Sequence, residues 1–164
     1  AGVKIDTFAY LPVQDFGNAF SIFISQNCGA GKTDRQRKGF RSATLISIAF
    51  SALISVLVVV FAGPLLRIFI RADETAVLAS GIQYLHMEGA FYIGIGCLFL
   101  LYGFYRGIGH PGISVVLTVV SLGTRVALAY LLAPVIGETG IWMAIPIGWF
   151  LADAIGYGWY YFKK

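Results

Sequence analysis

The sequence predicts an all-α fold, a polytopic membrane helix bundle with five transmembrane helices. Of its 164 residues, 58% are hydrophobic and only 12% are charged, whereas a soluble domain carries about 25% charged residues. Mean hydropathy is +0.79, and uncharged runs long enough to cross a bilayer recur along the chain. This composition excludes a disordered segment and argues against a soluble enzyme. Helices are expected because open strands leave backbone groups unpaired in lipid.

The first two spans are predicted over residues 4–29 and 42–66. The first is the most polar of the five, but residues 16–31 carry no charge. The second is an uncharged run of 25 residues, the clearest span in the sequence. Pro64 is expected to end or bend it, because proline removes a helical hydrogen bond.

The remaining spans are predicted over residues 76–106, 111–133 and 140–162. The third is interrupted in its first half by few polar residues, Glu88 among them. Proline opens the fourth span, a position that the first turn of a helix tolerates. The fourth is expected to stop near Pro134. All five spans are joined by short connections.

Basic residues predict the orientation of the bundle. If the five helices alternate in direction, eight Lys or Arg fall on one side of the membrane, and they are Lys32, Arg35, Arg37, Lys38, Arg41, Arg106, Lys163 and Lys164. Only Lys4, Arg67 and Arg71 fall on the other side. Cytoplasmic loops carry the excess of Lys and Arg. We therefore expect a multi-pass protein of the cell membrane with a cytoplasmic C-terminus. The positive charge then orients the protein in the membrane, and no nucleic acid is expected as a partner.

The sequence offers little support for catalysis or for a bound cofactor. Residues 107–112 fit the dinucleotide pattern G-x-G-x-x-G, but no strand precedes them and Pro111 opens a helix, so they are interpreted as a tight turn. Cys28 and Cys97 give neither a disulfide framework nor zinc spacing. No Ser-His-Asp or Cys-His grouping stands out. We expect no enzyme, no catalytic residue, no metal site and no cofactor.

Ionisable residues within the spans are the candidates for function. Each costs about 2.5–3.5 kcal/mol near the centre of a membrane helix, so each should face the bundle interior with a partner. At 1.5 Å per residue from the cytoplasmic end, Asp15 lies about 24 Å deep, Arg125 about 20 Å, Glu88 about 27 Å and Asp153 about 14 Å. We therefore predict an ion pair between Asp15 and Arg125. Candidate residues for substrate or ion coupling are Asp15, Arg125, Gln14, Asn18, Glu88 and Asp153. A pair that only locks helices together remains the alternative.

Several motifs resemble the multidrug and toxic compound extrusion (MATE) family. PVQDFGNAFS at 12–21, SQNCGAGK at 25–32 and RKGFR at 37–41 resemble the second helix of a lobe and the basic loop after it. LYGFYRGIG at 101–109 resembles the later helix that ends in R-G-x-G before a proline-led helix. GIWMAIPIG at 140–148 resembles the opening of a lobe's last helix. Their order and spacing cover almost the whole chain.

This resemblance implies a twelve-helix transporter built from two lobes of six helices. Residues 1–164 would then form helices eight to twelve, in the C-terminal lobe, with the N-terminal lobe and membrane lipid as partners. The implied function is antiport, with sodium ions or protons exchanged for small amphipathic cationic drugs, and with no cofactor besides the coupling ion. Some members carry an acid on the tenth helix close to the R-G motif, but residues 94–105 contain none.

Two other functions stay open. A flippase for lipid-linked saccharides shares the two-lobe plan, but it usually lines its cavity with several cationic residues, and Arg125 is the only one in a central span here. A non-transporting membrane scaffold would need no coupling residues at all.

Overall fold

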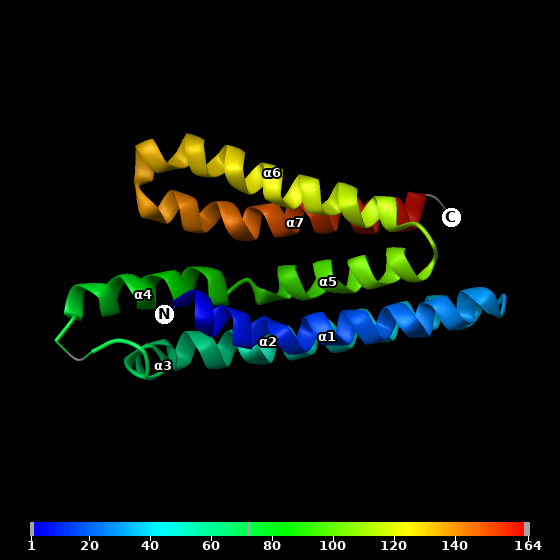
Figure 1. Cartoon of the computed structure of the whole chain (residues 1–164), viewed down its shortest axis with the longest axis horizontal. Coiled ribbons are helices and arrows are strands. Elements are labelled where there is room, and N and C mark those ends of the chain that lie inside the picture. The colour runs from blue at the N-terminus through cyan, green and yellow to red at the C-terminus, as the bar shows by residue number, and fades with distance from the viewer. Residues whose placement is uncertain (1, 72, 163–164) are drawn as a thin grey trace.

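The computed structural model describes residues 2–71 and 73–162, and in this part every regular element is an α-helix (Figure 1). The predicted all-α fold class is therefore confirmed. The elements are α1 (Gly2–Gly29), α2 (Thr33–Val60), α3 (Ala62–Arg67), α4 (Thr75–Gly89), α5 (Tyr92–Gly107), α6 (Pro111–Ile136) and α7 (Glu138–Phe162).

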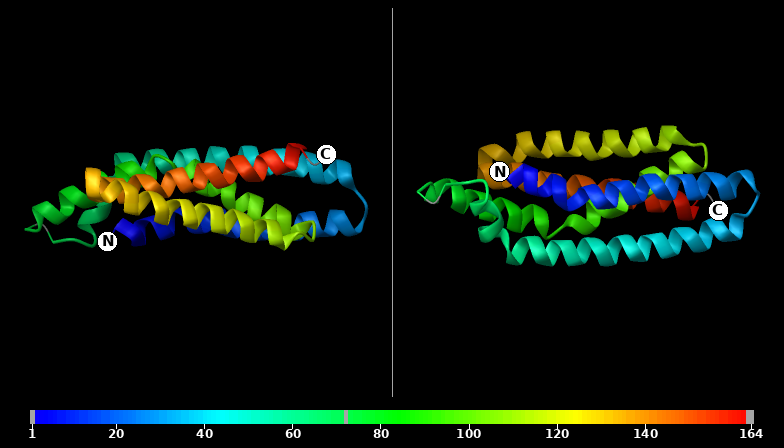
Figure 2. Two further views of the ribbon diagram at one scale, coloured as in Figure 1. Left: turned by 90° about the horizontal axis from the view of Figure 1, so that it is seen from above. Right: turned by 60° about the horizontal axis from the view of Figure 1, so that its bottom comes forward.

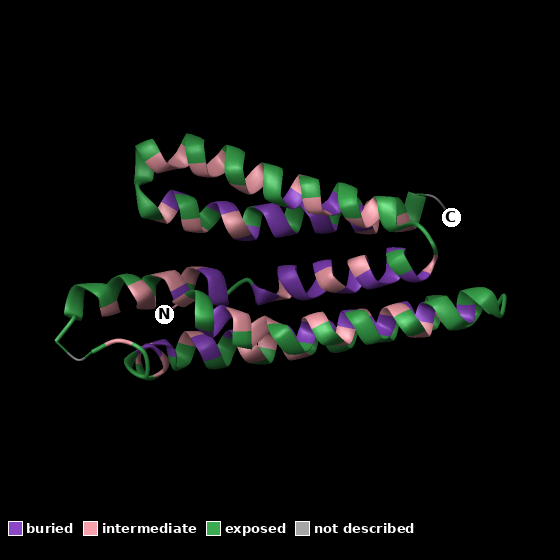
Figure 3. Ribbon diagram, viewed as in Figure 1, coloured by how far each residue is buried: buried purple, intermediate pink, exposed green. Residues whose placement is uncertain are grey.

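The long helices lie side by side along one axis, and α5 lies at the centre of the bundle (Figures 1 and 2). It packs against α1, α2, α6 and α7, while α6 and α7 form an antiparallel pair. Figure 3 shows the consequence, since α5 is the most buried of the helices and the outer faces of the others are exposed. Leu98, Leu100 and Leu101 of α5 are at most 1% exposed. The core therefore follows α5.

Most of the predicted spans satisfy the length and hydropathy that a membrane crossing requires. Helices α2, α6 and α7 do so alone, and α4 with α5 does so as one bent span. Helix α1 has 28 residues and lies along α5, but the described chain gives it no window of sufficient hydropathy. Its crossing therefore stays a prediction that rests on its length and packing.

The third predicted span, 76–106, is not one continuous helix. It consists of α4 and α5, which meet at a bend of 51°. Gly89 ends α4, and glycine is the poorest helix former after proline. The amide of Phe91 bonds to the carbonyl of Glu88, three residues back, where an α-helix requires four. Hydropathy does not detect this break because both sides of it are apolar.

The predicted boundaries of the second span also differ from the helix. Helix α2 begins at Thr33, nine residues before the apolar run, because a helix continues through polar residues once it has left the hydrocarbon. It ends at Val60, and Pro64 lies in the first turn of α3. A proline ring collides with the carbonyl four residues earlier, which is that of Val60, so the chain breaks at Phe61.

The turn between α6 and α7 is tighter than predicted. Helix α6 passes through Pro134 and ends at Ile136, and α7 begins at Glu138. Gly137 alone joins them with a φ of +64°, a conformation that favours glycine. This single-residue connection sets α6 and α7 antiparallel.

Tyr105 connects α5 to α7 through one hydrogen bond. Its hydroxyl donates to the carbonyl oxygen of Gly156 at 2.6 Å, and the side chain is 1% exposed. We expect Tyr105→Phe to lower the free energy of unfolding by about 1 kcal/mol, because the carbonyl loses a buried partner. Thermal melting of the purified protein measures this. Tyr130→Phe is the control, since Tyr130 is 80% exposed, and equal melting of both variants would contradict the prediction.

Candidate functional site

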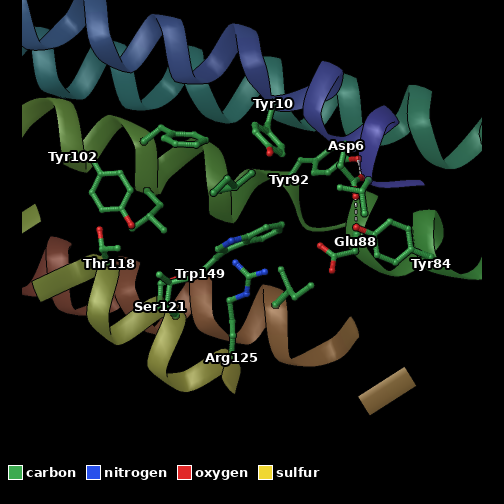
Figure 4. A pocket seen from close by; sticks show the side chains of 16 residues that line it. Asp6, Tyr10, Tyr84, Glu88, Tyr92, Tyr102, Thr118, Ser121, Arg125 and Trp149 are labelled. Carbon is green, nitrogen blue, oxygen red and sulfur yellow. Dashed lines mark hydrogen bonds between the residues drawn. The ribbon is translucent and has the colours of Figure 1, made fainter. Parts of the chain in front are cut away.

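The bundle contains a cavity of about 410 Å³ between α1, α4, α5, α6 and α7 (Figure 4). Six aromatic side chains contribute to its wall, and three charged side chains reach it. The lining residues are Val3, Asp6, Tyr10, Tyr84, Glu88, Tyr92, Ile95, Leu98, Phe99, Tyr102, Thr118, Ser121, Leu122, Arg125, Ile145 and Trp149.

The acidic side of the cavity comes from α1 and α4. Asp6 is buried, and its two carboxylate oxygens accept hydrogen bonds from the hydroxyls of Tyr84 and Tyr92. Glu88 is only 2% exposed, and its Oε1 has no hydrogen-bond partner among the described residues. Tyr84 and Tyr92 lie on either side of the bend between α4 and α5, and both line the cavity with Glu88. The fold therefore gathers two carboxylates at one end of the cavity.

The cationic side comes from Arg125 of α6. A Cβ atom at Gly148 of α7 would lie 2.7 Å from Cγ of Arg125 and 2.6 Å from the carbonyl oxygen of Ser121. Glycine at this position therefore lets α6 and α7 approach and leaves room for the arginine stem. Figure 4 shows the guanidinium beside Trp149, on the side of the cavity toward which the Glu88 carboxylate points.

The predicted ion pair between Asp15 and Arg125 is wrong. Asp15 is exposed and lies outside the cavity, and Arg125 makes no direct ion pair with any described carboxylate. The two residues have similar expected depths, but Asp15 is exposed and lies about 160° around α1 from Gly17, which contacts α5. Gln14 and Asn18 also lie outside the cavity. Their coupling roles remain untested predictions.

Asn18 and Asp153 have other surroundings. Nη2 of Arg106 donates to Oδ1 of Asn18 at 2.7 Å and so ties α5 to α1. Asp153 is 7% exposed, and its Oδ1 lacks a partner in the part of the chain that is described. It lies one turn before Gly156, which packs against Leu101 of α5. Asp153 therefore belongs to the contact between α7 and α5 and does not line the cavity.

Of the six predicted candidates, the structure brings Glu88 and Arg125 together. The candidates predicted from the sequence did not include Asp6, Tyr84, Tyr92 and Trp149, which line the same cavity. Two carboxylates and several aromatic faces suit a cation, since both carboxylates and the faces of aromatic rings attract positive charge. Among the described residues no group of three or more His, Cys, Asp or Glu is placed to hold a metal ion.

Comparison with known proteins agrees with this architecture. Curated relatives include the probable multidrug resistance proteins YoeA and YpnP of Bacillus subtilis, which are 22% and 28% identical over 162 residues. These alignments cover 97% and 98% of this chain but only 35% and 36% of the relatives. The chain therefore spans about a third of the length of the relatives it matches.

A solved structure shows the same fold. The Vibrio cholerae MATE transporter VcmN, in its bent form, superposes with a TM-score of 0.88 at 20% identity, and the match covers 98% of this chain and 36% of the VcmN chain. The structure of a VcmN point mutant gives a TM-score of 0.89 with the same coverage. The MatE family model matches residues 1–131. The cavity and its helices are thus part of a chain that belongs to the MatE family.

Proposed function

We propose that this chain is the C-terminal lobe of a multidrug antiporter in the cell membrane. In this proposal the complete protein exports small amphipathic cations in exchange for protons or sodium ions, and the cavity around Glu88 and Arg125 takes part in that exchange. The observation that carries it is a buried glutamate that faces an arginine in a cavity lined in part by aromatic rings, with one carboxylate oxygen that has no partner among the described residues. Intramembrane ionisable groups of this kind mark ion and substrate pathways in transporters.

The three charges suggest how coupling operates. While Glu88 is ionised, the positive field of Arg125 stabilises it and the cavity stays in one arrangement. A proton or sodium ion on the Glu88 carboxylate removes that attraction between the two charges. The two occupancies then favour different arrangements of the lobe, which is what a coupled exchange between two states requires. An organic cation competes for the same carboxylate and stacks on the rings around it.

Orientation is part of this proposal. The α1–α2 and α5–α6 connections lie at one end of the bundle, which is also the end that the C-terminal helix reaches (Figure 1). The basic residues of both connections therefore gather there, and the positive-inside rule assigns this end to the cytoplasm. Lys163 and Lys164, which the sequence analysis counted, lie outside the described residues. The N-terminal lobe of the same protein is the proposed partner of the cavity face.

Glu88→Gln and Arg125→Gln test the proposal in the complete protein. We expect each to lower substrate export at least about tenfold, a change of about 1.4 kcal/mol, because each variant removes one of the two charges on which the proposed exchange depends. Uptake of a fluorescent organic cation into everted vesicles, with a proton or sodium gradient, provides the measurement. Glu138→Gln is the matched control, since Glu138 is exposed at the start of α7. Wild-type export by both cavity variants at normal expression would refute the proposed site.

Two rival functions predict different results. A flippase for lipid-linked saccharides handles phosphate groups and would use several cationic residues, whereas Arg125 is the one cation that lines this cavity within the described chain. Loss of growth that depends on a lipid-linked saccharide, with drug export unchanged, would favour the flippase. A scaffold would show no gradient-dependent transport of either substrate.

A further inference from the structure

We propose that the basic end of the bundle binds an anionic phospholipid, with the phosphate group between α2 and α6 and an acyl chain between α6 and α7. This site lies at the opposite end of α5 from the acidic side of the cavity around Glu88, and the two sites share no lining residue. The inference needs only the membrane location of the bundle and holds whatever the protein transports.

The headgroup position is a cavity of about 500 Å³ where α2, α5, α6 and α7 meet. Arg37 from the second turn of α2 and His110 from the residue before α6 supply hydrogen-bond donors at its wall, and Gln36 lies beside Arg37. Phe104 and Trp159 also line this cavity and supply apolar surface. Such a site combines donors for a phosphate with a surface for glycerol and hydrocarbon.

A second crevice continues this cavity along the outside of the bundle. It has a volume of about 280 Å³ and shares His110, Ile113 and Trp159 with the first. It adds Val116 of α6 and Ile155 of α7, which are 49% and 41% exposed. Because the shared residues line both spaces, an amphipathic molecule can place its polar part in one and its hydrocarbon in the other.

The charge around the cavity selects a negative headgroup. Besides Arg37, the surface at this end carries Arg35 and Lys38 on α2, both exposed. Asp34 is the only acidic residue between positions 16 and 72. Each Lys or Arg near a membrane surface contributes about 1 kcal/mol of attraction to anionic lipid, and basic pockets between membrane helices on the cytoplasmic side hold anionic headgroups. An electroneutral lipid gains nothing from this field.

Lipid is favoured over a soluble phosphate by the crevice. The outward faces of α6 and α7 beside it expose large apolar side chains, including Val119 and Phe162, so the crevice opens onto the surface that contacts hydrocarbon. A free phosphate would occupy only the basic cavity and would leave Val116 and Ile155 uncovered. A phospholipid therefore accounts for both spaces, with its phosphate group in the cavity and its acyl chain in the crevice, whereas a small anion accounts only for the cavity.

Native mass spectrometry of the complete protein, released from bilayers of equal phosphatidylglycerol and phosphatidylcholine, tests the site. We expect phosphatidylglycerol to be retained in preference, and Arg37→Gln to reduce this retention about fivefold, the effect of about 1 kcal/mol per basic side chain. Arg67→Gln is the matched control, because it removes the same charge from an exposed arginine of α3, at the other end of the bundle (Figure 1). Arg37 is exposed, so its loss leaves the fold intact.

Two further arms separate the possible ligands. Val116→Trp fills the crevice and is expected to reduce retention of the lipid while Arg37 remains in place. Excess inorganic phosphate is expected to leave the bound lipid in place. Equal retention of both lipids, equal losses in Arg37→Gln and Arg67→Gln, or full displacement of the lipid by phosphate would each overturn the proposal.

Discussion

Gly103→Leu is expected to abolish folding of the complete protein, whereas Gly123→Leu is expected to leave it intact. A Cβ atom at Gly103 of α5 would collide with the carbonyl oxygen of Gly17 of α1, while a Cβ atom at Gly123 of α6 meets nothing within 4 Å. The atom in the way at Gly103 is backbone, so no side-chain rotation relieves the collision. Close approach through small residues is how membrane helices gain packing energy.

The expected size of the effect follows from the position of α5. Gly17 makes the reciprocal contact, since a Cβ atom there would lie 2.6 Å from the carbonyl oxygen of Phe99. Overpacking a tight interface costs about 1–3 kcal/mol, and more where backbone must separate. Because α1 and α5 share one of the largest interfaces in the bundle, we expect no monodisperse protein. Fluorescence-detected size exclusion of detergent extracts measures this. A monodisperse Gly103→Leu peak at wild-type yield would contradict the contact.

The apolar runs were sufficient to predict the class of fold, but not the internal geometry of each helix. An uncharged run implies a membrane helix because lipid leaves the backbone no other partner. The bend at Gly89 was not predictable in this way, since hydropathy is unchanged across it. The start of α2 at Thr33 was missed for a related reason. Hydropathy locates the hydrocarbon, and the helix extends beyond it.

The error at Asp15 shows what depth alone leaves out. Depth placed Asp15 and Arg125 at the same level, but it carries no information about which way a side chain points. At about 100° per residue, Asp15 lies about 160° from Gly17 around α1, whereas Asp6 lies only about 20° from it. Gly17 faces α5. Helical periodicity therefore identifies Asp6 as the inward carboxylate and Asp15 as the outward one.

Glu88 and Arg125 were among the predicted candidates because any charged residue inside a membrane span is costly, and the sequence reveals it without knowledge of the direction of its side chain. The uncharged residues that line the same cavity were harder to predict. Tyr84 and Tyr92 are ordinary residues of an apolar run, and only their spacing of four residues from Glu88 connects them to the site. Trp149 comes from α7, and no sequence signal relates it to α4. The three-dimensional arrangement of five helices determines that wall, so it required the structure.

Replacing both tyrosines that bind Asp6 is expected to destabilise the protein strongly. In Tyr84→Phe/Tyr92→Phe, the carboxylate stays buried at 6% exposure and loses both hydroxyl donors. Hydrogen bonds to charged groups are worth about 1.5–3 kcal/mol each, and a buried acceptor without a partner adds its desolvation cost. We therefore expect a loss of at least about 3 kcal/mol, measured as thermal unfolding of the purified complete protein.

A third substitution decides whether the tyrosines act through the carboxylate. Replacing every polar partner by an apolar group of similar shape is nearly neutral, whereas removing only some of them is costly. Adding Asp6→Leu to the double variant should therefore recover most of the lost stability. Adding Asp15→Leu should recover none, because Asp15 is exposed and remote from both rings.

This cycle separates a specific network from ordinary packing. If Tyr84 and Tyr92 stabilised the bundle only by filling space, phenylalanine would replace them at little cost and Asp6→Leu would make no difference to the double variant. Residues in one hydrogen-bond network show non-additive effects of about 0.5–3 kcal/mol. Recovery with Asp6→Leu and not with Asp15→Leu would show that the inward carboxylate of α1 is held by α4 and α5. Additive losses across all the variants would show instead that the three side chains act independently.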